Sequence, residues 1–542
     1  MNAGNTKTGA PLPEHCYLIG CEADSSSVAT LDVSAQLMGF KAYNLSKMSA
    51  LGLPVPPAFV LGTPWCSSDT MRARATDASV WHAGIAALEK ATGRRFGDPR
   101  VPLLVSVRSG APVSMPGMMD TLLNVGLCER TLGGLLRQTG NPRLVWDTWQ
   151  RLIRNWGVLV SGVPEHAFDE AYRSIAGARE EATLDFTELR ALAQRYLGVH
   201  ESETGVPFPQ DPSAQLAAAI SQVLSSWQSA RACEYRRHFK LDDAPGTAVT
   251  VQTMVFGNAG GRSGAGVAFT RSPLDGEPTL WADFLFNAQG EDVVAGKRVA
   301  RRVDELAEAI PSVWATLRES AATLERNFGD MQDIEFTVEE GNLYLLQTRT
   351  GKRSARAAAR IALDMLDEGL ITADTARERT ASIEMASLVT TRLVGEGNEI
   401  PKPLAHAASA NVGVTSGEIA LDTQRAAERC AKDVPVVLLR RDVDTADIAA
   451  SRTSNGLLTR NGTRTAHAAV VARQMGKVCL VGCTDLVIDD ATRSVTLNGV
   501  TLLEGEPITL DGDTGTVYAG TVRVETEPLA NLQARLMRLR SR

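Results

Sequence analysis

A single histidine, His467, lies between a polar loop and an apolar run of residues. The run from Ala468 to Met475 predicts the first turns of a buried helix. A helix N-terminus offers unpaired backbone N–H groups and a partial positive charge, so it binds anions, phosphate above all. Thr465 is placed to cap this helix. The local pattern therefore fits a phosphoryl-carrying imidazole and a structural histidine about equally well.

Two carboxylates are spaced for cation binding in the expected hairpin of residues 332–349. Residues two apart on a strand share a face, so Asp333 and Glu335 point the same way, as do Gln347 and Arg349 on the partner strand. Adjacent carboxylates repel unless a cation lies between them, and Mg²⁺ prefers oxygen ligands. The alternative is a solvated hairpin face with an ordinary Glu–Arg pair.

Arg108 follows an apolar, strand-like run from Leu103 to Val107, where a buried arginine normally needs an anionic partner. Lys41 stands near an expected helix start, and by itself it reads as a surface lysine.

A turn rich in glycine separates two strand-like runs and includes Gly261, Ser263 and Gly264. Glycines allow backbone N–H groups to approach phosphates closely. An ordinary hairpin turn has the same composition.

The composition is that of a globular protein: 542 residues, 44% hydrophobic and 22% charged, with a net charge of −7. This charge argues against a dedicated nucleic-acid binder. No apolar stretch reaches the roughly 20 residues of a membrane span, and no signal-peptide core is visible, so a cytoplasmic location is expected. The eight cysteines are expected to be reduced thiols. His166, His200 and His238 are expected at the surface.

The His467 segment resembles the phosphohistidine signature of the pyruvate phosphate dikinase and phosphoenolpyruvate synthase family, Gly-Gly-x-Thr-x-His-Ala-Ala. Here Thr463 replaces the second glycine, and Ala466 replaces the usual Ser or Cys. Further upstream segments resemble the dikinase closely; they span residues 39–45, 51–57, 105–111, 114–121, 256–258, 263–271 and 287–296.

The resemblance implies a multidomain chain of the α/β and α+β classes. An ATP-grasp nucleotide-binding domain is expected at 14–350, with a helical insertion at about 130–245. A helical connector and hinge is expected at 351–404. A swivelling phosphohistidine α/β domain is expected at 405–525, followed by a C-terminal helix at 526–542.

The resemblance also implies ATP as substrate and Mg²⁺ as cofactor. The resemblance and the glycine-rich turn together give three sets of expected site residues. The expected catalytic residues are His467, Arg108 and Thr465. The expected metal ligands are Asp333 and Glu335. The expected nucleotide-binding residues are Lys41, Arg108, Gly261, Ser263, Gly264, Glu335, Gln347 and Arg349.

In this family the histidine attacks the β-phosphorus of ATP, AMP leaves, and inorganic phosphate then takes the terminal phosphoryl group in the dikinase branch. The sequence ends at Arg542, shortly after the histidine domain, without the roughly 250 residues that the family's substrate-binding barrel would need. The phosphoryl acceptor is therefore expected outside the recognised modules, as a small molecule or on a separate subunit. No nucleic-acid or membrane partner is expected, and homo-oligomerisation stays open.

The main expectation is an ATP-dependent phosphotransferase that forms (pyro)phosphohistidine on His467. The alternatives to it are a catalytically silent, ATP-binding regulatory paralogue and an ATP-grasp kinase or ligase that acts directly on a small molecule. Retention of Lys41, Arg108, Glu335, Gln347 and His467 together argues against the silent paralogue.

Overall fold

The computed structural model describes residues 12–21, 33–113, 115, 118–242, 245–294, 301–395, 401–442, 453–465 and 467–541. The chain forms two compact units. The first contains residues up to Ala259 together with Tyr344–Gln347, and the second contains Gly260–Leu343 and Thr348–Arg542. These units divide the chain at other points than the predicted domains, whose boundaries stay predictions.

A five-stranded antiparallel sheet forms the centre of the first unit. Its strands, in spatial order, are β1 (Cys16–Ile19), β2 (Ala58–Leu61), β7 (Ala248–Thr253), β5 (Val105–Gly110) and β6 (Thr121–Val125). Every residue of β2 and β7 is buried, although β7 includes the polar residues Thr250, Gln252 and Thr253. Shorter elements around the sheet are α1 (Ala35–Met38), α2 (Phe40–Ala50), η1 (Thr63–Cys66), α3 (Asp69–Ala75), α4 (Ala78–Thr92), β3 (Arg95–Phe96) and β4 (Pro102–Leu103).

Helices dominate the rest of the first unit, as the apolar spacing of three and four predicts. They are α5 (Glu129–Thr139), α6 (Pro142–Leu159), α7 (Glu165–Ala176), η2 (Glu181–Thr183), α8 (Phe186–Thr204), α9 (Pro212–Ser226) and α10 (Ala230–Phe239). The side chains of Asn141, Asp185 and Asp211 cap α6, α8 and α9 by accepting backbone N–H groups.

The surface prediction for His200 is wrong. This residue lies on α8 with only 1% of its surface exposed. Its Nε2 is 2.9 Å from the Ser161 hydroxyl, and its ring meets Phe208 edge to face. Burial lowers the pKa of His200, so the neutral imidazole is favoured inside the helical core.

Another five-stranded antiparallel sheet has the order β10-β9-β8-β11-β12, and its strands belong to the second unit except for residues Tyr344–Gln347 of β12. The strands are β8 (Gly264–Phe269), β9 (Trp281–Phe286), β10 (Arg301–Arg302), β11 (Gln332–Glu339) and β12 (Asn342–Thr350), and the helices that follow β9 and β10 are α11 (Gly290–Val294), α12 (Val303–Ala309) and α13 (Pro311–Phe328). A Cβ atom at Gly264 would lie 2.2 Å from the Phe284 ring, so close strand packing requires glycine there.

An eight-stranded sheet follows, in the order β14-β24-β23-β16-β17-β18-β19-β15. Its members are β14 (Ala405–His406), β15 (Ala408–Asn411), β16 (Val414–Ala420), β17 (Val436–Arg440), β18 (Gly456–Thr459), β19 (Val478–Val481), β23 (Pro507–Asp511) and β24 (Thr516–Ala519). Strands β16 to β19 pair in parallel, and α16 (Thr423–Cys430) and α18 (His467–Gln474) connect them. A small sheet of β20 (Leu486–Asp489), β21 (Ser494–Leu497) and β22 (Val500–Leu503) lies next in sequence.

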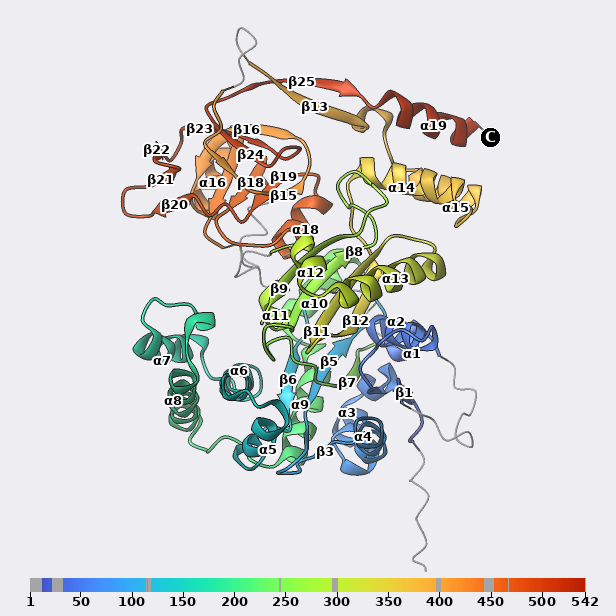
Figure 1. Cartoon of the computed structure of the whole chain (residues 1–542), viewed down its shortest axis with the longest axis vertical. Helices are drawn as coiled ribbons and strands as arrows, with labels where there is room; N and C mark the ends of the chain where they lie inside the picture. Colours follow the sequence, from blue (N-terminus) through green and yellow to red (C-terminus); the bar gives the residue numbers. More distant parts are fainter. Residues whose placement is uncertain are drawn as a thin grey trace, which may run out of the picture. The chain divides into compact units, whose positions relative to one another are not determined.

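Two segments that flank this α/β part in sequence pair with each other. Strand β13 (Val389–Val394) forms an antiparallel ribbon with β25 (Arg523–Pro528), which leads into the C-terminal helix α19 (Ala530–Ser541) (Figure 1). Residues 396–400 of the connector and hinge expected at 351–404 lie outside the described residues. Helices α14 (Ala355–Asp367) and α15 (Ala373–Thr380) and the short η3 (Met385–Ser387) precede β13.

The tail helix α19 packs onto α14 and α15 through one apolar cluster. Leu536 and Leu539 are buried there. Gln533 donates to the Met385 carbonyl oxygen over 2.9 Å, and Arg540 donates to the Ile383 carbonyl oxygen over 2.8 Å. Helix α19 therefore returns the chain to the elements that precede β13. Among the described residues, no helix combines the length and apolarity needed to cross a bilayer.

We predict that Leu536→Ala loosens α19 without unfolding the chain. Removing a fully buried leucine side chain costs about 2–5 kcal/mol of packing free energy. Amide hydrogen exchange of residues 530–541 should accelerate, while exchange in the eight-stranded sheet stays slow. Met537→Ala is the matched control, because Met537 is 55% exposed. Equal exchange rates in the two variants would contradict this packing.

Candidate active site

Arg108 is held by two neutral oxygens on the central sheet of the first unit. It lies on β5 and is half-buried. Its Nη1 donates to the Gln252 side-chain oxygen over 3.4 Å and to the Leu346 carbonyl oxygen over 3.3 Å. Neither of these oxygens carries a formal charge. These two hydrogen bonds orient the guanidinium group of Arg108 on β5.

Lys41 is brought to the same strand by a tight backbone contact. The Phe40 N–H donates to the Ala111 carbonyl oxygen over 2.8 Å, which fixes the start of α2 at the end of β5. Gly39 has a φ of 74°, and a Cβ atom there would lie 1.9 Å from the Gly110 carbonyl oxygen. Only glycine meets both conditions, so Gly39 sets the place of Lys41 two residues later.

Gln252 is a positioning residue that sequence reasoning missed. Its side chain is buried on β7, where it donates to the Pro56 carbonyl oxygen over 3.0 Å while accepting from Arg108. The Leu345 N–H donates to the Pro54 carbonyl oxygen over 2.8 Å, so the same proline-rich segment also anchors β12. The predicted Gln347, on that strand, is buried. The sequence offered no distinct signal for Gln252, because the strand of residues 248–253 also contains Thr250 and Thr253.

Asp333, in the second unit, carries a buried carboxylate with one satisfied oxygen. It is 2% exposed on β11, and Arg349 Nε donates to its Oδ2 over 2.8 Å. Its Oδ1 has no hydrogen-bond partner among the described residues. Burial raises the pKa of Asp333 although Arg349 opposes the shift, and burial would lower the pKa of Arg349 but Asp333 and Glu335 raise it.

Asp333 and Glu335 suit a Mg²⁺ site that is completed by ligand oxygens better than a metal site formed by protein side chains alone. The backbone places Glu335 on the same face of β11 as Asp333, with the apolar Ile334 and Phe336 buried on the other. The described residues contain no group of three or more His, Cys, Asp or Glu that could hold a metal ion. Mg²⁺ commonly takes one or two carboxylates and fills its shell with phosphate and water oxygens. Asp333 and Glu335 would hold it here, and the orphaned Oδ1 of Asp333 is suited to that role.

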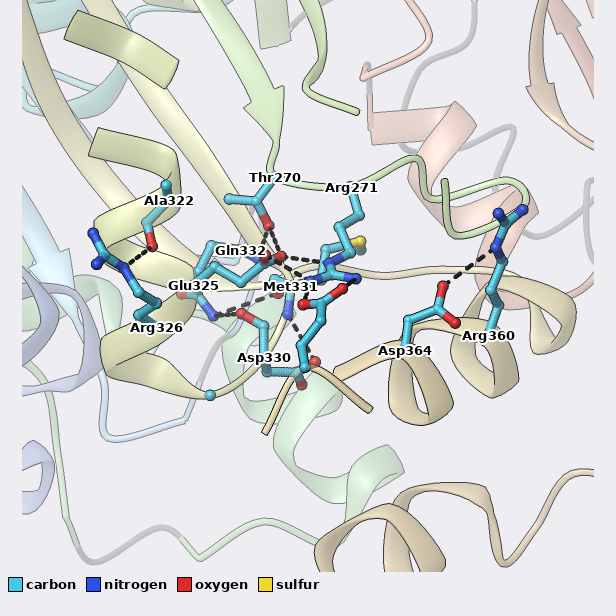
Figure 2. A network of polar contacts seen from close by, with 12 residues as sticks. Thr270, Arg271, Ala322, Glu325, Arg326, Asp330, Met331, Gln332, Arg360 and Asp364 are labelled. Atoms are coloured by element: carbon cyan, nitrogen blue, oxygen red, sulfur yellow. Dashed lines mark hydrogen bonds and ion pairs between the residues drawn. The ribbon is translucent and has the colours of Figure 1, made fainter. Parts of the chain in front are cut away.

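A polar network fixes the strand end that carries Asp333 (Figure 2). Arg271, at the end of β8, donates to Glu325 on α13 over 2.9 Å and to Glu368 after α14 over 2.5 Å. The Thr270 hydroxyl donates to Glu325 and accepts the backbone N–H of Gln332. Because Gln332 directly precedes Asp333, this network holds the carboxylate at a defined place on the sheet.

The glycine-rich turn is braced against the β11–β12 hairpin. The buried Ser263 hydroxyl accepts the Glu340 N–H over 2.9 Å, and the Arg262 carbonyl oxygen accepts the Gly341 N–H over 2.9 Å. Gly261 is exposed in the turn, with no atoms near the place a side chain would take. Gly264 already belongs to β8. A nucleotide-binding role for Gly261, Ser263 and Gly264 stays a prediction.

A third carboxylate shares the face of Asp333 and Glu335. Glu335 is opposite Val267 in the sheet, and Val267 is opposite Asp283 on β9. Cross-strand neighbours point to the same side, so Asp283 lies in one row with Glu335. Asp283 is 2% exposed, and only its Oδ1 has a hydrogen-bond partner among the described residues. A charged residue within the apolar strand of residues 281–286 was the signal that sequence reasoning overlooked.

The loop that leads into His467 is bound to this face. Arg464 donates to Asp283 Oδ1 from Nε over 3.0 Å and from Nη2 over 2.8 Å. The Thr463 hydroxyl donates to the Val293 carbonyl oxygen over 3.4 Å. Both contacts lie within the second unit, and they place the approach to His467 on the side of the sheet that carries the carboxylates.

Helix α18 begins at His467, after the carboxyl end of the parallel strand β18. The side chain of His467 and the whole of Ala466 lie outside the described residues. The Thr465 hydroxyl is 3.1 Å from that of Thr463, and Thr465 is two residues before the first helical residue. Its predicted capping and catalytic roles remain predictions.

Arg473, which sequence reasoning also missed, is a cation buried on α18 with 2% of its surface exposed. It donates to the Ala410 and Arg464 carbonyl oxygens over 3.0 and 3.1 Å, and it lies 5.5 Å from the centre of the Phe269 ring. Burial lowers the pKa of Arg473 to about 10, although Asp333 and Asp283 oppose this shift. Arg473 therefore adds positive charge beside the carboxylate face.

We predict that Gln252→Leu weakens ATP binding about tenfold, because Arg108 loses the acceptor that orients it. Isothermal titration calorimetry measures the affinity, and circular dichroism checks that the variant is folded. Ser106→Ala is the control, since its hydroxyl donates to the Gln252 backbone oxygen and not to the side chain. A folded Gln252→Leu variant with wild-type affinity would show that Arg108 needs no such support.

A second prediction concerns the cation. Asp333→Asn should remove most of the extra thermal stability that Mg²⁺ confers on the chain with a non-hydrolysable ATP analogue, because a ligand that binds only the folded state raises its melting temperature. Asp374→Asn, at an exposed site on α15, should leave the Mg²⁺ effect intact. A full Mg²⁺ effect in Asp333→Asn would exclude this carboxylate as a ligand.

Comparison with known proteins agrees with this arrangement. A family model described as "Pyruvate phosphate dikinase, AMP/ATP-binding domain" matches residues 77–308 and 307–370. A second, described as "PEP-utilising enzyme, mobile domain", matches residues 433–515. These matches and the two kinds of sheet confirm the predicted fold class, an ATP-grasp nucleotide-binding domain followed by a phosphohistidine domain.

Curated relatives extend the likeness over most of the chain. The pyruvate, phosphate dikinase of Clostridium symbiosum is 39% identical over 514 residues, which are 92% of this chain and 58% of that protein. The dikinase of Rhizobium meliloti is 40% identical, over 90% of this chain and 56% of that protein. The chloroplastic pyruvate, phosphate dikinase 1 of Oryza sativa is 39% identical, over 89% of this chain and 52% of that protein. The chain thus spans about half the length of these relatives, and it belongs to the pyruvate phosphate dikinase family.

Proposed function

We propose that this chain is an ATP-dependent phosphotransferase that loads a phosphoryl group onto His467. The observation that carries the proposal is the contact between Arg464 and Asp283. It joins the loop before His467 to the sheet face that bears Asp333 and Glu335. An acceptor histidine and a pair of cation-binding carboxylates on one side of one sheet are what phosphoryl transfer from a metal-bound nucleotide requires.

In the proposed reaction, neutral His467 attacks the β-phosphorus of ATP. A nitrogen–phosphorus bond forms, and the bond between the β-phosphorus and the oxygen that bridges it to the α-phosphorus breaks. AMP leaves with that oxygen, and the imidazole N–H proton is released to solvent. The β- and γ-phosphorus atoms remain on His467 as a pyrophosphoryl group. An imidazole with the reference pKa of about 6.5 is mostly neutral at pH 7 and can serve as this nucleophile.

The charged residues would contribute mainly by position. Lys41, Arg108 and Arg349 would bind phosphate oxygens. Asp333 and Glu335 would hold Mg²⁺, which neutralises charge on the phosphates. Fixed cations that match the charge of the transferred group lower the barrier without moving during the reaction.

The second step would follow the dikinase branch. Inorganic phosphate would attack the terminal phosphorus of the pyrophosphoryl group, breaking the bond to the oxygen between the two phosphorus atoms. Pyrophosphate would leave without that oxygen, and phosphohistidine would remain. His467 would then pass its phosphoryl group to an acceptor outside the two matched modules.

Labelled ATP tests the loading step. We predict that [β-³²P]ATP labels the protein in a form that is labile to acid and stable to base, and that His467→Ala abolishes the label. His406→Ala is the matched control, because His406 is another histidine of the eight-stranded sheet and is exposed on β14. ATP binding without any label in the wild type would contradict the proposal.

The same assay separates the alternatives. A silent paralogue binds ATP and takes no label. A kinase that acts directly on a small molecule transfers only the γ-phosphoryl group, and His467→Ala leaves its rate unchanged. With [γ-³²P]ATP in place of the β-labelled nucleotide, release of labelled pyrophosphate on addition of phosphate would support the dikinase branch.

A further inference from the structure

Arg464 makes a contact that the loading reaction does not by itself require. Its side chain is a quarter exposed, whereas that of Asp283 is 3% exposed. Two nitrogens of the guanidinium donate to the same carboxylate oxygen, and Nη2 also donates to the Ala282 carbonyl oxygen over 3.1 Å. Charge-assisted hydrogen bonds of this kind are the strong ones in proteins.

An aromatic ring strengthens this contact. The Arg464 guanidinium carbon lies 4.1 Å from the centre of the Trp281 ring. Trp281 is two residues before Asp283 on β9, so both side chains are on the same face of the strand. A cation that is desolvated over a tryptophan ring is attracted by the ring as well as by the carboxylate. The pair is therefore specific for arginine, because lysine cannot both stack and donate from two nitrogens.

Two further contacts hold the loop from its other side. Arg473 donates to the Arg464 carbonyl oxygen over 3.1 Å and thereby fixes the backbone at the residue that makes the contact. The Thr463 hydroxyl reaches the Val293 carbonyl oxygen. Thr463 stands where the family signature has glycine, so this hydrogen bond is one that the signature residue could not make. The residues just before His467 are therefore held by specific hydrogen bonds to other elements of the second unit.

We propose that Arg464 is a positioning residue for phosphoryl transfer. By binding Asp283 over Trp281, it seats the His467 loop on the carboxylate face and so sets how often His467 meets the bound nucleotide. This inference rests on the proposed function and extends it by assigning residues to the docking step. Arg464 governs the rate of loading, and the affinity for ATP is left to other residues.

The first experiment separates docking from binding. Arg464→Gln keeps a polar side chain that can donate a hydrogen bond, but it is shorter and lacks the charge and the fork. It should lower the single-turnover rate of [β-³²P]ATP labelling at least roughly tenfold at saturating ATP, because an unpaired buried carboxylate disfavours the docked state. The dissociation constant for ATP should stay within about twofold of wild type. Arg441→Gln is the matched control, since Arg441 pairs with Asp490 at the surface of the same α/β part.

A double-mutant cycle and a conservative variant test the pairing itself. Asp283→Asn should slow labelling by a similar factor, and the double variant should be no slower than either single variant, because all three lack the same pair. Arg464→Lys should recover part of the rate. If the two single effects multiply, the residues act separately, and the proposed pairing is wrong.

Hydrogen exchange reports docking without any turnover. In Arg464→Gln, amides of residues 281–286 and 460–465 should exchange faster than in wild type, while amides of β16 and β17 do not change. If wild type takes no label but this exchange pattern appears, the proposed function fails and the docking contact stands. The inference would be overturned if Arg464→Gln were labelled at the wild-type rate and its amides exchanged at the wild-type rates. It would also be overturned if a loss of ATP affinity in this variant accounted for its whole decrease in labelling rate.

Discussion

The carboxylate of Asp333 is almost wholly withdrawn from solvent, and an ionised group in that position is costly unless a cation lies beside it. Arg349 supplies one cation to one oxygen, and the other oxygen has no partner among the described residues. Asp283 repeats the arrangement on the same face of the sheet, with Arg464 as its cation. Each of these two buried carboxylates is thus paired with an arginine from another element: Arg349 of β12 pairs with Asp333, and Arg464 of the loop before His467 pairs with Asp283. A divalent cation bound with the nucleotide phosphates would offset the remaining negative charge at the carboxylate oxygens that have no hydrogen-bond partner among the described residues.

In the first unit, Arg108 donates to two neutral oxygens, and Lys41 is fixed two residues after the glycine that packs on β5. In each unit, residues that would not touch the nucleotide hold the charged side chains in place. Gly39 permits a contact that any side chain would block, Gln252 orients Arg108, and the network around Arg271 holds the strand end before Asp333. Phosphoryl transfer depends mostly on such positioning, because little covalent chemistry is asked of the protein beyond the nucleophile.

Much of this arrangement could be predicted from the sequence, where local rules apply. The alternation of Asp333, Ile334, Glu335 and Phe336 predicted one polar and one apolar face, which burial and strand register confirm. The helix after His467 followed from its apolar spacing. Partners distant in sequence could not be predicted in this way: Arg464 and Asp283 are 181 residues apart. His200 was mispredicted because charged neighbours on α8 suggested solvent, whereas the helix turns that residue towards Phe208. Asp283 was the detectable miss, since it interrupts an apolar strand, whereas Gln252 lies in a strand that also contains Thr250 and Thr253.

In the proposed loading step, His467 takes the pyrophosphoryl group of ATP, which contains its β- and γ-phosphorus atoms, and AMP is released. Exchange of radiolabelled AMP into ATP tests it most directly, because a reversible loading step returns AMP to ATP with no acceptor or added phosphate present. The account predicts exchange by the wild-type chain with Mg²⁺, and its loss in both His467→Ala and Asp333→Asn. Exchange of labelled ADP but not AMP into ATP would contradict the account, since the γ-phosphoryl group alone would then be transferred.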